Sequence, residues 1–382
     1  MNHKIMKAHI TIFLSLVFFS ICSGQSWTPP VNVSNMESSS FPDIAIDGNG
    51  IIHIVWIAIF ENNVRKVMYS YSNDDGETWS IPFDVSQNSE KALWSANIVI
   101  GSDGKLYVSY DYDIGNYYET LVHMKIFDGM DWSPTIVVSE GMPHSHSNIL
   151  VKDFEDRVYV FWFYGYSFCY RYLEGHEWSD VIFPYEEQHT IESAVSDSDN
   201  NIHCAGHYTY WGKTVPGVRI TYFKYNKSSD VWSDMSIINE DDVNIGVDID
   251  LDNNFLPHIL WNKDFTHSSP GIRGHVYCHQ IAENIWSEEE FVEFCGPNAF
   301  QKIHLNEQGH VNVFLTKEFG EGYEFDHCYK SDDTWSCTRI DSSDNSMILG
   351  RPNVDEMEGI LYIAYGKCSD RGHCNTCLQS PI

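Results

Sequence analysis

The apolar residues of this chain occur in short runs separated by polar turns. Examples are IIHIVW at 51–56, KLYVSY at 105–110 and RVYVFW at 157–162. Period-two alternation is frequent, and no segment keeps a 3.6-residue apolar period over the length of a helix. The chain is 14% aromatic, with 12 Trp and 22 Tyr, and strands favour such residues. The pattern predicts an all-β protein.

Two markers recur along the chain at intervals of about 50 residues. The first is a tryptophan that opens a strand, usually followed by serine, at Trp27, Trp79, Trp132, Trp178, Trp232, Trp286 and Trp335. The second is a polar turn before an apolar strand, at 47–50, 102–104, 154–156, 198–201, 252–254, 307–309 and 356–359. Seven copies of a unit with four short strands predict a seven-bladed β-propeller.

The ends of the chain predict how this ring closes. After Tyr365 there is room for one more strand, at 374–379, but no tryptophan-led strand follows it. Such a strand is present at the N-terminus, at 26–34. We expect this N-terminal strand to complete the C-terminal blade, because closure removes an exposed sheet edge. The expectation is a single domain of four-stranded blades over residues 25–382.

Residues 1–24 have the pattern of a signal peptide. Lys4 and Lys7 precede the apolar run 10–21, and Cys22-Ser-Gly24 supplies small residues for cleavage. A lipid-anchored Cys22 is the alternative to simple secretion. No later segment approaches the roughly 18 apolar residues of a membrane span. We expect a soluble, monomeric protein, extracellular or periplasmic, with no membrane insertion.

The chain is strongly acidic, with 23 Lys+Arg against 54 Asp+Glu and a formal net charge of -31. This charge argues against binding to nucleic acid or to anionic membrane surfaces. Many of the acids fall in predicted turns, where they favour solubility. A polyanionic ligand would therefore need a local basic pocket on an acidic body.

The order of strands within a blade predicts which face carries function. If the strands are named a to d from the inside outward, the a–b and c–d turns share one face, and the b–c and d–a connections share the other. Ligands of propellers generally bind at the mouth of the central channel on this second face. The starts of the a strands place Asp43, Asn97, Glu192, Asp248, Lys302 and Arg351 around that channel.

The b–c loops carry the densest candidate chemistry. Histidine and tyrosine transfer protons near neutral pH, and arginine binds carboxylate or sulfate in a bidentate manner. We take as catalytic candidates His207, Tyr208, Tyr210, His275 and, from a d–a loop, His144. As substrate-binding candidates we take Arg219, Arg273, Arg371, Trp211, Asp264 and Asp248. The expected ligand is an acidic sugar or polysaccharide.

Two of these arginines belong to a repeated motif. Pro216-Gly-Val-Arg219 and Pro270-Gly-Ile-Arg273 are one repeat apart. We expect the two arginines to lie side by side on blades 4 and 5 and to share one anionic group. The alternative is a turn with a solvated arginine paired to local acids.

Histidines and cysteines allow several roles. His53, His203 and His258 lie in predicted b strands, where packed or hydrogen-bonded side chains are expected. His144 and His146 are loop residues that either bind a metal, move a proton or are solvated. Cys328 and Cys337 are placed to face each other across strands c and d. Cys368, Cys374 and Cys377, near His373, fit either a disulfide or a zinc site. A structural metal ion is thus possible, and no other cofactor is indicated.

The segment Ser72-Asn-Asp-Asp-Gly-Glu-Thr-Trp79 matches the pattern Ser-x-Asp-x-Gly-x-Thr-Trp. This turn, the Asp box, makes the chain resemble the sialidase-like, BNR-repeat propeller superfamily over the whole length after the signal peptide. The resemblance implies a structural role for the box, whose Asp caps its own turn. The Arg-Ile-Pro motif of true sialidases is absent, because Phe41-Pro-Asp-Ile stands in its place. The catalytic roles of that family are therefore not carried over.

A second resemblance is to seven-bladed polysaccharide lyases that act on uronate-containing algal glycans such as ulvan. Those enzymes use His and Tyr for proton transfer, with Arg neutralising the uronate. Three functions stay open: a secreted glycan-cleaving hydrolase or lyase, a non-catalytic glycan- or protein-binding propeller, and a structural repeat protein. If the protein is an enzyme, we expect a deep pocket in which the pKa values of His, Tyr or carboxylate groups are perturbed. If it is a binder, we expect a shallow aromatic face without such groups.

Overall fold

The computed structural model describes residues 27–36, 38–61, 64–87, 92–115, 119–185, 189–210, 217–239, 244–265, 273–296, 299–319, 322–332, 334–343, 346–348, 351–369 and 374–380. The predicted signal peptide lies outside these residues. The regular elements of the described residues are all strands, and none of them forms a helix long and apolar enough to cross a membrane.

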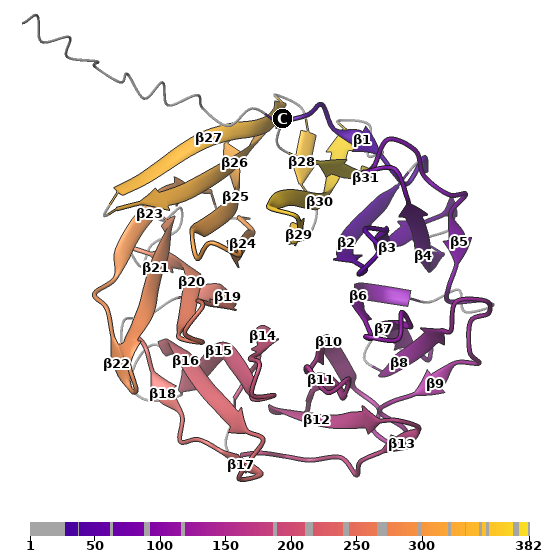
Figure 1. The fold of residues 1–382 in the computed structure, drawn as a ribbon, viewed down its shortest axis with the longest axis horizontal. Helices are drawn as coiled ribbons and strands as arrows, with labels where there is room; N and C mark the ends of the chain where they lie inside the picture. Colours follow the sequence, from indigo (N-terminus) through magenta and orange to yellow (C-terminus); the bar gives the residue numbers. More distant parts are fainter. Residues whose placement is uncertain are drawn as a thin grey trace, which may run out of the picture.

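Seven antiparallel sheets form a closed ring around a central axis, as predicted (Figure 1). Blade 1 contains β2 (Ser39–Ile46), β3 (Ile52–Ile59), β4 (Arg65–Ser72) and β5 (Phe83–Asp84). Blade 2 contains β6 (Ala92–Ile100), β7 (Leu106–Asp113), β8 (Thr120–Phe127) and β9 (Ile136–Val137). Blade 3 contains β10 (Ser145–Lys152), β11 (Val158–Tyr164), β12 (Ser167–Glu174) and β13 (Glu177–Trp178).

The other blades repeat this order with small additions. Blade 4 contains β14 (Ser193–Ser196), β15 (Ile202–Tyr210), β16 (Gly217–Asn226), β17 (Val231–Trp232) and β18 (Ser236–Ile237). Blade 5 contains β19 (Asn244–Leu251), β20 (Pro257–Asp264), β21 (Arg273–Ala282), β22 (Ile285–Trp286) and β23 (Glu290–Cys295). Blade 6 contains β24 (Gln301–Leu305), β25 (Val311–Phe319), β26 (Gly322–Ser331) and β27 (Thr334–Ser343).

Blade 7 closes the ring with strands from both ends of the chain. It contains β28 (Ser346–Ile348), β29 (Asn353–Met357), β30 (Ile360–Ser369), β31 (Cys374–Gln379) and, as its outer strand, β1 (Val31–Asn32). β1 pairs antiparallel with β31 through Val31 and Leu378. The N–H of Thr28 also donates to the carbonyl of Ser380 at 2.8 Å. The predicted closure by the N-terminal strand is confirmed.

The repeated tryptophans lie between the blades. Each packs, partly buried, against a different one of the seven apolar clusters that fill the interfaces between neighbouring blades: Trp27, Trp79, Trp132, Trp178, Trp232, Trp286 and Trp335. The serine after the tryptophan has its own repeated role. In five blades its hydroxyl accepts a main-chain N–H of strand c at 3.0–3.1 Å, at Ser80, Ser133, Ser179, Ser233 and Ser287. This bond fixes the chain as it enters the outer strand.

The Asp box of blade 1 is a self-contained turn. The carboxylate of Asp74 accepts the N–H of Thr78 at 2.9 Å and the hydroxyl of Ser72 at 2.8 Å. The indole N–H of Trp79 donates to the carbonyl of Gly76 at 3.1 Å. Hydrogen bonds from the threonine and serine hold the pKa of Asp74 below its usual value. All these contacts are internal to the turn, which is the structural role that the resemblance implied.

Three blades contain the same chain of polar groups at the turn face. A turn aspartate lies near a b-strand histidine, whose Nδ1 meets the hydroxyl of a c-strand tyrosine at 2.6–2.8 Å: His53 with Tyr69, His203 with Tyr222 and His258 with Tyr277. These histidines are buried. The prediction that they are hydrogen-bonded blade residues is confirmed.

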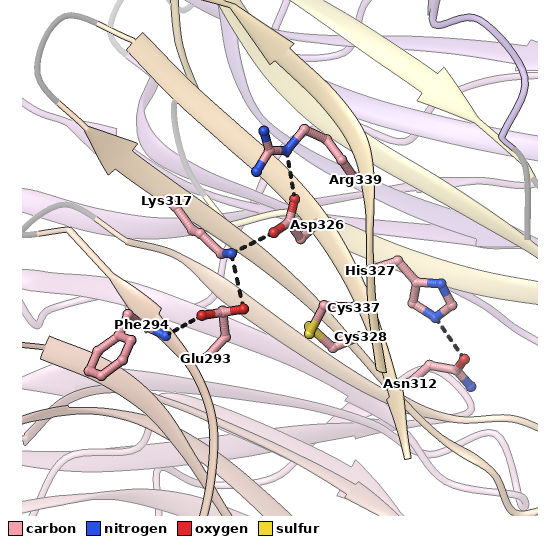
Figure 2. Close-up of a disulfide and its surroundings, with 9 residues drawn as sticks. All are labelled: Glu293, Phe294, Asn312, Lys317, Asp326, His327, Cys328, Cys337 and Arg339. Atoms are coloured by element: carbon pink, nitrogen blue, oxygen red, sulfur yellow. Dashed lines mark hydrogen bonds and ion pairs between the residues drawn. A yellow bond between two sulfur atoms is a disulfide. The ribbon is translucent and has the colours of Figure 1, made fainter. Parts of the chain in front are cut away.

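The predicted pairing of Cys328 with Cys337 is also confirmed. The two residues are cross-strand neighbours on β26 and β27 and form a disulfide (Figure 2). Five further cysteines are buried and reduced, Cys169, Cys204, Cys278, Cys295 and Cys377. The side chains of Cys368 and Cys374 lie outside the described residues, as does His373.

We predict that deleting residues 27–34 breaks the ring. The deletion removes the outer strand of blade 7, the fully buried Val33 and the edge-to-face contact of Trp27 with Phe314 of blade 6. The exposed edge of β31 would then pair with other chains. Size-exclusion chromatography and calorimetry should show aggregation or the loss of cooperative melting. A truncated protein that stays monodisperse and melts like the intact chain would contradict the role of this strand.

The buried histidines predict a loss of stability in mild acid. Burial lowers the pKa of His53, His123, His258 and His327 to about 4, whereas the unfolded chain protonates histidine near 6.5. The unfolded state therefore binds more protons as the pH falls below about 6.5, and the free energy of unfolding decreases. Asp43, whose pKa is raised to about 6, takes up a proton in the folded state over the same range and offsets part of this loss.

Calorimetry at pH 8, 7 and 6 should therefore show a Tm that is constant at first and lower at pH 6. The variant His53→Gln keeps a group that can hydrogen-bond to Tyr69 and removes one titrating ring. Its Tm should fall less between pH 7 and pH 6 than that of the unmodified protein. Equal slopes in the two proteins would show that His53 does not supply this dependence.

Candidate functional site

A cavity lies on the propeller axis, where the inner strands of all seven blades begin. Its volume is about 310 Å³, near the lower end for ligand pockets. Its charged and amide lining is Asp43, Asn97, Glu192, Asp248, Lys302, Arg351 and Asn353. Six of these are the residues that the repeat placed around the channel. In Figure 1 the inner strands β2, β6, β10, β14, β19, β24 and β29 surround this axis.

The inner strands are irregular where they reach this cavity. The register between strands a and b shifts near the start of β2, β6, β10 and β19. Phe41, Ser147 and Gly246 adopt positive φ values of 52°, 56° and 69° in these bulges. A bulge bends a strand and redirects its side chains, and such bulges are frequent next to functional sites. Here they shape the wall of the channel mouth.

Carboxylates of the inner strands join neighbouring blades at four junctions of the ring. Asp43 accepts the N–H of Ile98 at 2.8 Å, Glu192 that of Val247 at 2.9 Å and Asp248 that of Ile303 at 2.8 Å. Further along the channel, Asp250 and Asp355 accept main-chain N–H groups of blades 6 and 1 at 2.7 Å. These acids satisfy main-chain donors at the inner edge of the ring, so they hold the blades in register.

Two cations lie among these carboxylates. Arg351, ahead of β29 in blade 7, reaches across the channel to blade 4. There it donates to the carbonyl of Glu192 at 3.2 Å and lies 3.6 Å from the carboxylates of Glu192 and Asp248. Lys302 of blade 6 lies 3.4 Å from Asp248, which is fully buried. The two ion pairs of Arg351 are longer than ordinary hydrogen bonds, so a ligand anion has room to compete for its N–H groups.

His207 is tied to this cluster through Glu192. Its Nδ1 lies 2.6 Å from Oε1 of Glu192, and its side chain is 26% exposed. The hydrogen bond from His207 and the charge of Arg351 lower the pKa of Glu192 against the effect of burial. Glu192 is therefore ionised at neutral pH and can only accept, so Nδ1 of His207 carries the proton. Nε2, the other ring nitrogen, is therefore the atom through which His207 would exchange a proton with a ligand.

Asp43 is the second titratable group of the cavity. Burial raises its pKa to about 6, although two main-chain N–H groups and the nearby Lys302 lower it. Near neutral pH the cavity thus holds one carboxyl close to its titration midpoint and one, Glu192, that is ionised. Environments that separate the pKa values of neighbouring acids are typical of acid–base sites.

Tyr208 points away from this cluster because neighbouring residues of a strand face opposite sides. Its ring centre lies 5.1 Å from that of His189, and its cross-strand neighbour is Arg219. Tyr210 ends β15, and its side chain is outside the described residues, as are Trp211 and Arg371. The structure therefore places His207 against Glu192, which lines the channel cavity, and gives Tyr208 and Arg219 a separate place, on the side of blade 4 that faces blade 3.

The expected equivalence of Arg219 and Arg273 is wrong by one residue. The polar chains of blades 4 and 5 are 55 positions apart, since His203 with Tyr222 corresponds to His258 with Tyr277. In that register Arg219 corresponds to Gly274, and Arg273 corresponds to Val218.

A one-residue offset in a strand turns a side chain to the opposite face. On β16, Phe223 lies four positions after Arg219, so both side chains are on the same face, and Phe223 packs between blades 3 and 4. On β21, Tyr277 lies four positions after Arg273, so both side chains are on the same face, and Tyr277 packs between blades 5 and 6. The two arginines face away from each other, so a shared anion is not supported.

The remaining candidates of blade 5 lie at its interface with blade 6. Asp264 is buried and forms an ion pair with Arg273 at 3.5 Å. His275 is fully buried, and burial together with the charge of Lys317 lowers its pKa to about 3. Lys317 itself bridges Asp326 at 2.6 Å and Glu293 at 3.4 Å (Figure 2). His275 is neutral and inaccessible here, so we do not place it in the proposed site.

His144 and His146 are exposed beside the start of β10, and His144 has a φ of 75°. The ring of His146 packs 5.2 Å from that of Phe163. Among the described residues no three His, Cys, Asp or Glu side chains gather as metal ligands. Glu192, the partner of His207, and Arg351, which contacts Glu192, were placed near the channel by the repeat but were not chosen as site residues. The signal that indicates them is their position at the start of an inner strand.

Comparison with known proteins supports the fold. No family model matches the sequence, and no curated protein does. The structure is similar to that of an ulvan lyase of polysaccharide lyase family PL25 bound to -[GlcA(1-4)Rha3S]-, with a TM-score of 0.61 and 12% identity over 92% of this chain and 93% of that chain. It is also similar to a protein of unknown function from Dyadobacter fermentans DSM 18053, with a TM-score of 0.60 and 10% identity over 94% and 99%.

A third similar structure is the α-L-arabinanase of Penicillium chrysogenum complexed with arabinobiose, with a TM-score of 0.53 and 12% identity over 92% of this chain and 98% of that chain. Identities this low show the fold alone. The expected resemblance to carbohydrate-active propellers is confirmed at that level: the chain has the fold of a group of β-propellers that includes a polysaccharide lyase and an arabinanase.

Proposed function

We propose that the protein cleaves an acidic glycan that it binds at the channel mouth, with His207 as the proton-transferring base. The observation that carries this proposal is the chain of contacts His207–Glu192–Arg351: Glu192 and Arg351 line the channel cavity, and His207 is hydrogen-bonded to Glu192 at its edge. The ulvan lyase and the arabinanase with this fold act on or bind sugars, which agrees with a glycan as ligand.

The proposed chemistry follows from the protonation states. Nε2 of His207 accepts a proton from the substrate, and the Glu192 carboxylate stabilises the imidazolium that forms. Removal of a proton next to a uronate carboxylate requires that its charge be neutralised. Arg351 and Lys302 supply the cations for this. The electron pair of the broken C–H bond forms a carbon–carbon double bond as the glycosidic C–O bond breaks, and Asp43, with its pKa near 6, is the candidate proton donor to the leaving oxygen.

The acidic class of the ligand rests on these two cations. Both cations lie near the buried carboxylate of Asp248. A carboxylate or sulfate of the ligand would therefore compete with Asp248 for the N–H groups of these cations. Charge-assisted bonds to arginine are among the stronger polar contacts. We also infer that the chain is exported, because the Cys328–Cys337 disulfide fits an oxidising compartment.

The second candidate is a non-catalytic glycan binder. The observation that favours it is that the cavity acids Asp43, Glu192 and Asp248 all accept main-chain N–H groups of the next blade. These hydrogen bonds give the three acids a role in holding the blades together, which requires no catalytic function. A binder needs the cations and the cavity but no base.

The variant His207→Ala should separate these two functions. Incubation with a panel of anionic polysaccharides is read by reducing ends and by the absorbance of new carbon–carbon double bonds. We expect kcat/KM to fall by roughly 10²–10⁴-fold, the usual contribution of a general base, with little change in affinity. The control His176→Ala removes an exposed histidine from a c–d turn of blade 3, on the opposite face, and should retain full activity. Retarded migration without any cleavage by the unmodified protein would instead support a binder.

Arg351→Ala should lower the affinity for an acidic substrate by roughly tenfold to a hundredfold, because the loss of charge-assisted bonds costs about 1.5–3 kcal/mol of binding free energy. Arg351→Lys retains the charge and loses the bidentate geometry, so an intermediate effect is expected. Affinity electrophoresis and KM measure both variants, and the Tm shows whether Glu192 and Asp248 tolerate the loss of their cation. An unchanged KM in a folded Arg351→Ala protein would exclude Arg351 from substrate binding.

A further inference from the structure

A second cavity lies between blades 4 and 5 on the face of the a–b and c–d turns, opposite the channel mouth. Its volume is about 740 Å³, larger than that of the channel cavity and within the range of ligand pockets. Its lining comes from the a–b turns of both blades and from the c–d ends of β16 and β21. The residues that matter to the argument are Lys224, Asn226, Asp234, Phe255, Gln280 and Asn284.

Phe255 breaks a rule that the other blades follow. Six a–b turns share one geometry, in which the fourth residue donates its N–H to the carbonyl of the first and has a positive φ. That position is occupied by Gly50, Gly104, Asp156, Asn200, Phe255 and Gly309, with φ values of 61–81°. Positive φ favours Gly, Asn and Asp and strains a bulky residue.

The strained position of Phe255 is not explained by burial, because its side chain is still 38% exposed. A large aromatic ring that is held in an unfavourable backbone conformation, yet remains open to a cavity, points to a role in contact with a ligand. Aromatic rings supply broad apolar surface for contact with the C–H faces of a sugar.

The floor of the cavity is rigid and polar. Asp197, His203 and Tyr222 are buried and hydrogen-bonded in a row, with 3.0 Å between Asp197 and His203 and 2.8 Å between His203 and Tyr222. Lys224 lies 3.3 Å from Asp197. The other ionisable lining groups, Asp199, Asp234 and Glu283, are acidic. This balance disfavours an anionic ligand, whereas amides and carboxylates suit sugar hydroxyls.

We propose that this pocket binds a segment of neutral oligosaccharide, with one sugar ring against Phe255 and its hydroxyls bonded to the surrounding amides and carboxylates. The site would hold a neutral stretch of glycan on the face opposite the channel mouth. It stands independently of the function proposed for the channel, because it shares no residue with that cavity.

The test is native affinity electrophoresis of the full mature chain in gels that contain arabinan, galactan, mannan or a β-glucan. We expect at least one of these neutral polymers to retard the unmodified protein. Phe255→Gly introduces the residue that blades 1, 2 and 6 have at this position, so it should relieve strain and weaken binding at least tenfold. Its Tm should be equal to or above that of the unmodified protein.

One further variant completes the experiment. Phe154→Ala is the matched control, because Phe154 is 63% exposed in the equivalent turn of blade 3 and does not line the pocket. It should bind like the unmodified protein. Three outcomes would overturn the proposal: no retardation in any neutral gel, equal retardation of Phe255→Gly and the unmodified protein, or a lower Tm for Phe255→Gly.

Discussion

The packing of one tryptophan between each pair of neighbouring blades is the contact on which the ring depends. A four-stranded blade cannot bury both of its apolar faces alone, so each blade is stable only between two others. Truncating a large core aromatic costs about 3–5 kcal/mol, a sizeable part of the 5–15 kcal/mol typical of a domain. The serine hydrogen bond after the tryptophan sets its direction, and the N-terminal Trp27 supplies the seventh copy. The order of the ring is therefore local in sequence except at its single point of closure.

At the axis, the same architecture leaves main-chain N–H groups that need acceptors. The inner strands leave main-chain donors at the edge of the channel, and carboxylates from the preceding blade satisfy them. Glu192 shows how this structural role leads to chemistry: one oxygen accepts the N–H of Val247, and the other meets His207. A fold that concentrates acids at its axis must also place cations there. Arg351 and Lys302 do so, and the result is a site in which protonation states are set by the structure.

The two faces of the propeller differ in what varies between repeats. On the turn face the a–b turns are nearly uniform, so the one departure, Phe255, stands out against five turns with Gly, Asn or Asp. On the loop face the inner strands contribute different residues to the cavity, and four of these strands carry bulges. Residues that depart from the preferences shared by the other repeats are therefore the ones expected to contact a ligand.

The sequence by itself determined the all-β class, the seven blades, the closing strand, the Cys328–Cys337 disulfide and the bonded histidines His53, His203 and His258. All of these follow from local periods and from spacings within or between adjacent strands. The tertiary structure decided the rest. The motif places Arg219 and Arg273 54 positions apart, but the strands repeat every 55, and this one residue turns the side chains apart. The contact of Arg351 with Glu192 joins residues 159 positions apart across the channel, and only the curvature of the closed ring brings them together.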